Sequence, residues 1–123
     1  YDLDPATGAI SNRTRIATPG EADGRPDGAA ADVEGCYWSA GVSAGCLNRY
    51  DRDGKLLLRI PVPMRAPTMP CFGGPDMRTL LVTSLRRAET GPDCGKVIAG
   101  RVDVAGVPVG RFRTAAGGSS RNE

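Results

Sequence analysis

Glycine and proline interrupt this sequence so often that long helices are excluded, and this constrains the fold most. The 123 residues include 17 glycines and 10 prolines, which favour turns over helix interiors. No segment carries apolar residues at helical spacing over three turns without such an interruption. The apolar residues instead form short runs of strand length between turn signals, at 36–40, 56–60, 79–83 and 107–109. The sequence therefore predicts an all-β fold.

Short sequence echoes recur along the chain at intervals typical of a repeat protein. The segments 26–28 and 70–72 both begin with proline and lie 44 residues apart, as do Tyr37 and Leu81 in the strands that follow. A period of about 40–50 residues with several strands per unit is typical of β-propeller blades. The echoes predict two nearly complete blades and the outer edge of another. An all-β sandwich with irregular repeats is the alternative that they leave open.

Charge and hydropathy exclude several classes of partner. The formal net charge is +2, from 16 basic and 14 acidic residues, which gives no electrostatic basis for binding nucleic acid or an anionic membrane. No run approaches the roughly 20 apolar residues that span a bilayer. The chain opens on Tyr1 rather than Met, and no signal peptide precedes the first strand signals. We therefore expect a processed or truncated chain with no nucleic-acid or membrane partner.

The cysteine and histidine content limits the chemistry further. The four cysteines are Cys36, Cys46, Cys71 and Cys94, and no two of them have C-x-x-C spacing. The chain has no histidine, so Ser-His-Asp and Cys-His chemistry and histidine metal sites are excluded within it. Buried thiols in a cytoplasmic protein are the expectation, with disulfide pairing left open.

A series of ordered motifs carries a resemblance to a known family. The motifs are Pro-Asp-Gly at 26–28, Asp-x-Glu-Gly at 32–35, Trp-Ser-Ala at 38–40, Leu-Asn-Arg-Tyr-Asp-Arg-Asp-Gly-Lys at 47–55, Cys-Phe-Gly-Gly at 71–74 and Leu-Leu-Val-Thr-Ser at 80–84. Together they resemble the C-terminal portion of SMP-30/gluconolactonase/LRE-like proteins, over roughly residues 1–113. The resemblance implies part of a six-bladed β-propeller, with about two to three four-stranded antiparallel blades. The Gly/Ser-rich stretch at 114–123 predicts a disordered tail.

The resemblance also implies an activity and a site. Proteins of this family are gluconolactonase-like hydrolases of sugar lactones, and they hold one divalent metal in a central pocket. Ca²⁺ is the metal that the resemblance implies first, with Zn²⁺, Mg²⁺ or Mn²⁺ as alternatives. By analogy Asp27 is both a metal ligand and the catalytic base that activates water. A metal polarises the lactone carbonyl as a Lewis acid, and a neighbouring carboxylate accepts a proton from water.

Plainer interpretations stand beside these assignments. Pro-Asp-Gly is also a common turn sequence, in which Asp bonds its own backbone and Gly accepts a positive φ. Asp32 and Glu34 are predicted to be ordinary hairpin residues, and Trp38 a residue of the blade core. The segment 51–54 begins like an EF-hand loop, but Val62 stands where that loop needs glutamate. We predict a hairpin turn there.

Three functional hypotheses follow from the sequence. The first is a lactone hydrolase of which this chain is a fragment, inactive alone because a single carboxylate cannot hold Ca²⁺. The second is a non-catalytic assembly or binding module, in which copies associate through open blade faces. The third is an unrelated all-β protein, which requires the ordered motifs to be accidental.

Overall fold

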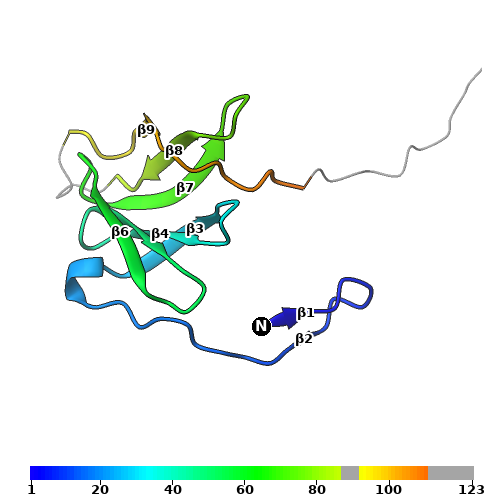
Figure 1. Cartoon of the computed structure of the whole chain (residues 1–123). Coiled ribbons are helices and arrows are strands. Elements are labelled where there is room, and N and C mark those ends of the chain that lie inside the picture. The colour runs from blue at the N-terminus through cyan, green and yellow to red at the C-terminus, as the bar shows by residue number, and fades with distance from the viewer. Residues whose placement is uncertain (87–91, 111–123) are drawn as a thin grey trace, which may run out of the picture.

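The fold consists of short antiparallel strands (Figure 1), in a computed structural model that describes residues 1–86 and 92–110. One 3-10 helix, η1 (Glu21–Asp23), precedes the main sheets. The strands are β1 (Asp2–Leu3), β2 (Ile10–Ser11), β3 (Pro26–Ala31), β4 (Tyr37–Gly41), β5 (Cys46–Tyr50), β6 (Leu56–Pro61), β7 (Pro67–Gly73), β8 (Thr79–Ser84) and β9 (Val97–Arg101). These elements confirm the all-β prediction. No helix in the described ranges has the length and apolar character needed to cross a membrane.

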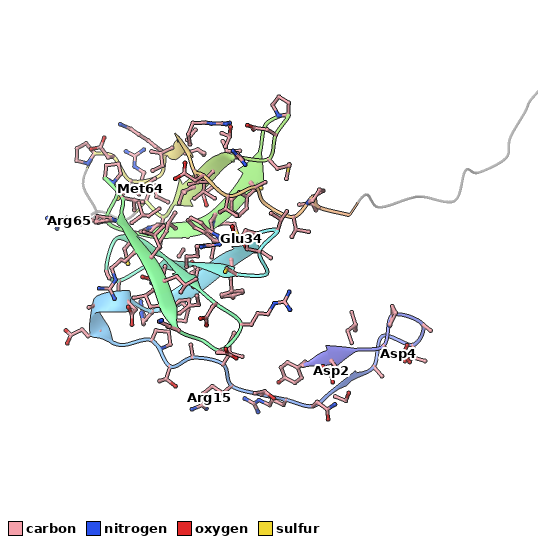
Figure 2. The ribbon with its side chains drawn as sticks, viewed as in Figure 1. Asp2, Asp4, Arg15, Glu34, Met64 and Arg65 are labelled. Carbon is pink, nitrogen blue, oxygen red and sulfur yellow. The ribbon has the colours of Figure 1, made fainter. Side chains whose placement is uncertain are left out.

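Each sheet is a meander in which strands pair in chain order. Strands β3–β6 form a four-stranded sheet, here called the first blade, and β7–β9 form a three-stranded sheet, the second blade. The hairpin β1–β2 lies apart from both blades, at the end of an extended segment (Figure 1). Asp2 and Asp4 mark this hairpin in Figure 2.

The described residues thus hold one four-stranded blade, one three-stranded blade and a separate hairpin, in agreement with the predicted part of a propeller. The sequence predicts a strand at 107–109, but this segment is irregular, and only an isolated bridge between Asp32 and Gly106 precedes it. The predicted boundary at residue 113 and the tail at 114–123 lie outside the described residues.

The two blades repeat with a period of 42 residues rather than 44. Ala30 pairs with Trp38 in the first blade, and Phe72 pairs with Leu80 in the second, each 42 residues later. The 44-residue spacing compares Pro26 with Pro70, whereas the residue of the second blade that corresponds to Pro26 is Pro67. Pro26 and Pro67, the first residues of β3 and β7, both stand just before a register shift in the ladder.

The core lies between the two blades. The buried cluster consists of Trp38, Ala40 and Leu47 from the first blade with Phe72, Leu80 and Val82 from the second. The Trp38 and Phe72 rings meet edge to face at 5.6 Å between centroids, a geometry that aromatic quadrupoles favour. The sequence correctly predicted Trp38 as blade core, since its exposed fraction is 1%.

A return segment after β9, residues 102–109, ties the two blades together, and we call it the strap. Its backbone bonds to the β3–β4 side through Val33 N to Ala105 O at 2.9 Å and Val107 N to Ala31 O at 3.0 Å. It bonds to the β7–β8 turn through Gly106 N to Met77 O at 2.8 Å. Gly106 is required there because a Cβ would collide with the Phe72 ring.

Candidate functional site

Asp27 lies in a strand and not in a turn. It is the second residue of β3 (Pro26–Ala31), and neither it nor Gly28 has a positive φ. Asp27 and Gly28 together oppose Ala40, because the register shifts between Pro26 and Ala29. Such a bulge re-aims side chains at the end of a strand. The turn interpretation of Pro-Asp-Gly is therefore wrong.

Gly28 is explained by the close approach of β7. A Cβ at Gly28 would lie 2.6 Å from the carbonyl oxygen of Thr68 and would collide with the Met69 sulfur. No side chain fits at this distance, so only glycine lets the first strands of the two blades pack together. Asp27 consequently stands one residue from the point where β3 touches the beginning of β7.

The Asp27 side chain is exposed and takes no part in the hydrogen bonds or ion pairs among the described residues. It is therefore available to a ligand or a metal. Within residues 1–86 and 92–110, no three His, Cys, Asp or Glu side chains gather to hold a metal ion. Ca²⁺ requires about 6–8 oxygen ligands. Within the described residues, Asp27 is thus not part of a cluster of three such side chains.

An apolar groove of about 280 Å³ runs along the two inner strands, β3 and β7. Ala29 and Ala31 line it from β3, Met69 and Cys71 from β7, and Val109 from the strap. The alanines leave the groove open, because the β3 residues that line it carry only methyl groups. The groove begins next to Gly28, where Met69 contacts that glycine.

A buried ion-pair network centred on Asp32 was missed at the sequence level. The Asp32 carboxylate is 1% exposed and accepts bonds from Trp38 Nε1 at 2.8 Å, Arg49 Nε at 2.7 Å and the Cys36 amide at 3.0 Å. Burial acts to raise the pKa of Asp32, but these hydrogen bonds outweigh it and the pKa is lowered. Asp32 therefore organises the first blade. The prediction of an ordinary hairpin residue was wrong for Asp32.

Arg49 extends this network to the protein surface. It also bonds the carboxylate of Glu34 at 2.6 Å, and Figure 2 labels Glu34 between the two blades. The two carboxylates raise the pKa of Arg49, so that it stays charged. A cavity of about 370 Å³ is lined by Glu34, Arg49 and Arg101, and Asp27 does not line it. The network therefore stabilises the first blade and is separate from the Asp27 site.

A second polar cluster lies on the opposite face of the first blade, under η1. Asn48 Nδ2 donates to the Asp23 carbonyl oxygen at 2.7 Å, and Arg59 pairs with the Asp23 carboxylate. Burial raises the pKa of the neighbouring Cys46 thiol, which keeps it protonated and unreactive. The Tyr50 hydroxyl is buried here with no hydrogen-bond partner among the described residues. This cluster holds η1 against the sheet.

The remaining sequence expectations can be placed as well. The Asp51 carboxylate accepts the amides of Asp53 at 3.0 Å and Lys55 at 2.8 Å, which confirms the hairpin turn between β5 and β6. Cys36 and Cys46 are buried thiols. Cys71 is an exposed thiol, so the expectation of burial was wrong for it.

Two consecutive antiparallel meanders, packed face to face and opened by bulged inner strands, define blades of a β-propeller. The model of the SMP-30/gluconolactonase/LRE-like region matches residues 1–86. The chain belongs to this family.

Curated relatives include lactonases and regucalcins. The chain is 48% identical over 89 residues to the 6-deoxy-6-sulfogluconolactonase of Pseudomonas putida, covering 68% of this chain and 31% of the relative. It is 44% identical over 84 residues to the pentonolactonase of Haloferax volcanii, covering 68% and 29% respectively. It is 38% identical over 85 residues to the regucalcin of Danio rerio, again covering 68% and 29%. The chain thus spans about a third of the length of these relatives.

Solved structures agree with the fold. The calcium-binding protein regucalcin from Agrobacterium tumefaciens superposes with a TM-score of 0.77 at 33% identity, covering 89% of this chain and 40% of that one. A luciferin-regenerating enzyme superposes with a TM-score of 0.71 at 30% identity, with the same coverage. The described blades therefore have the arrangement found in propellers of this family.

Proposed function

We propose that this chain is part of a sugar-lactone hydrolase and is inactive alone, with Asp27 as its contribution to the active site. The observation that carries the proposal is the exposed carboxylate of Asp27 near the start of an inner strand, which forms no hydrogen bond or ion pair with any other described residue. The lactonase relatives support lactone as the substrate class. The thiols of Cys36 and Cys46 support a cytoplasmic location.

The Asp27 carboxylate suits two tasks in lactone opening. It can accept a proton from an attacking water as a general base, or it can donate an oxygen to a divalent cation, for which Ca²⁺ is our first choice. Such a cation, when bound, would polarise the lactone carbonyl. In this proposal the other oxygen ligands come from blades that the chain does not contain.

A chimera tests the catalytic role. We would replace the matching segment of the Pseudomonas putida relative with residues of this chain and follow acid release from its lactone in a pH-stat. We expect hydrolysis by the chimera and none above background by the chain alone. Asp27→Asn should lower kcat/KM by at least about a hundredfold. Asp53→Asn, in an exposed turn, is the matched control and should leave kcat/KM unchanged. Wild-type activity in the Asp27 variant would contradict the proposal.

Metal binding can be tested on the chain itself with Mn²⁺ as a paramagnetic probe. The chain has three methionines, and Met69 is the one that contacts Gly28. We expect Mn²⁺ to broaden the Met69 methyl resonance before those of Met64 and Met77, and Asp27→Asn to abolish the effect. Equal broadening of all three signals would contradict a metal at Asp27.

A second candidate function is assembly without hydrolysis. The face of the second blade that points away from the first exposes apolar side chains, among them Leu81 (37%) and Val97 (61%). Self-association of copies through this face is the corresponding proposal. A defined oligomer that neither binds nor hydrolyses lactone would favour it over the enzyme.

A further inference from the structure

Met69 is a large apolar side chain that remains half exposed next to the candidate site. Its exposed fraction is 47%, whereas the prolines on either side of it in β7, Pro67 and Pro70, are fully buried. Buried prolines fix the backbone around Met69, since proline restricts φ and the conformation of the residue before it. The backbone position of Met69 is therefore restricted, and its sulfur lies against Gly28.

The contacts of Met69 place it beside Asp27. The space where a Gly28 side chain would stand is filled by the Met69 sulfur and the Thr68 carbonyl, and Asp27 directly precedes Gly28. Met69 also lines the apolar groove along β3 and β7. The exposed carboxylate thus belongs to the residue before Gly28, and the Met69 thioether that packs on Gly28 lines the apolar groove.

We propose that Met69 contacts the substrate, its thioether forming the apolar wall of the lactone site beside Asp27. A sugar lactone presents C–H groups on the faces of its ring and hydroxyls around its rim. Ligand sites commonly combine a mostly apolar lining with a few polar groups that fix orientation. In this proposal Met69 supplies the apolar lining, and Asp27 supplies a polar group that fixes the orientation of the lactone. This assignment rests on the proposed lactone hydrolysis and makes Met69 a specificity residue, with no part in proton transfer.

The first test uses D-glucono-1,5-lactam, a hydrolysis-resistant analogue, on the chain with ¹³C-labelled methionine methyl groups. We expect the lactam to shift the Met69 signal while the signals of buried Met64 and of Met77 stay fixed. Met69→Leu assigns the signal by removing it. The shift should persist in Asp27→Asn, because the wall requires neither metal nor base. A Met69 signal that does not move at lactam saturation overturns the inference, even where Mn²⁺ broadening supports the metal role of Asp27.

The second test measures specificity in the chimera. Met69→Gln keeps the length of the side chain but makes it polar, so we expect KM for the lactone to rise about tenfold with little change in kcat. Met69→Leu keeps the apolar wall, so we expect it to raise KM clearly less than Met69→Gln does. A fall in kcat with unchanged KM, or equal effects of Gln and Leu, would overturn the assignment. Loss of activity on Asp27 substitution is scored separately, so the two proposals can fail independently.

Discussion

Asp27 and Asp32 belong to the same strand-and-turn unit, but their surroundings give them opposite roles. Asp32 is buried and accepts four hydrogen bonds, from Trp38, Arg49 and two backbone amides. Asp27, five residues earlier, is exposed and bonds nothing among the described residues. A carboxylate that is fully satisfied serves the fold, whereas an unsatisfied one is available for chemistry.

Gly28→Ala should destabilise the protein by about 1–3 kcal/mol, the usual effect of overpacking. The added methyl group would meet the Thr68 carbonyl at 2.6 Å as well as the Met69 sulfur. Gly100→Ala is the matched control, because nothing lies within 4 Å of the place that its Cβ would occupy and its φ is not positive. Urea denaturation compares the two. An unchanged free energy of unfolding in Gly28→Ala would contradict the close contact of the blades.

Asp32→Asn should lower the free energy of unfolding by about 3–5 kcal/mol, the usual loss when one partner of a buried ion pair is removed. The pKa of Asp32 is lowered on folding, so its contribution is fully present above the unfolded value of 3.8 and disappears as the pH falls through the lower folded pKa. Denaturation at pH 7 and pH 2 should therefore show a smaller difference in the variant than in wild type.

Asp76→Asn is the control for this pH dependence. Arg101 lowers the pKa of Asp76 as well, but both side chains are exposed, and exposed pairs contribute little to stability. A pH profile of Asp32→Asn that matches the wild-type profile would contradict the role of Asp32.

At the scale of elements, the strap determines how the blades are joined. It bonds to Val33 and Ala31 on one side and to Met77 on the other, while Gly106 packs on Phe72. Blade faces alone could slide past one another, because apolar packing is not directional. The strap adds hydrogen bonds with fixed geometry and so sets the relative position of the sheets.

We expect Gly106→Val to displace the strap from the two blades, because the valine side chain would overlap the Phe72 ring. We expect the free energy of unfolding to fall by about 1–3 kcal/mol and hydrogen exchange to be faster at the amides of Val33 and Val107. Gly110→Val is the matched control, since no atom of the described residues lies within 4 Å of the place that its Cβ would occupy. Retained protection of both amides in Gly106→Val would refute the proposed clamping.

At the scale of the whole molecule, the second blade presents an open apolar face among the described residues. Leu81 and Val97 are exposed there by 37% and 61%, and they would be covered in a complete ring, where each blade packs on the next. Exposed contiguous apolar surface promotes association.

Leu81→Lys combined with Val97→Lys should therefore lower the weight-average mass measured by light scattering after size exclusion, at any concentration where wild type self-associates. Val109→Lys, on the strap and 78% exposed, should leave the mass unchanged. The same measurement with Ca²⁺ shows whether the ion alters assembly. Identical masses for all three proteins would exclude this face as the contact.

The architecture was predictable because strand length and turn chemistry are local properties. The Asp51 turn and the strands around Trp38 and Leu81 follow from residues within a few positions of each other. The correct repeat of 42 residues was not predictable from the echoes, because the register depends on bulges that a sequence does not display. Asp32 was missed for a similar reason: its partner Arg49 lies on another strand, and charged residues in polar turns are usually solvated.

The candidate site was predictable only through the family resemblance. The residues themselves allow Pro-Asp-Gly to form a turn, whereas in the structure this segment pairs with β4 and its glycine packs against Thr68 and Met69 of the other blade. Met69 carries no sequence signal, since an isolated methionine between two prolines indicates neither burial nor binding. Contacts between blades determine both features.

The bridge between Asp32 and Gly106 has a consequence for how the chain acquires its structure during synthesis. Gly106 leaves the ribosome 74 residues after Asp32, so the first blade is synthesised before Asp32 has this partner. Such distant pairings slow folding, because loop closure is needed before the contact forms. At about 5–20 residues per second, the delay lasts several seconds. We expect this interval to be when the nascent chain depends most on chaperones.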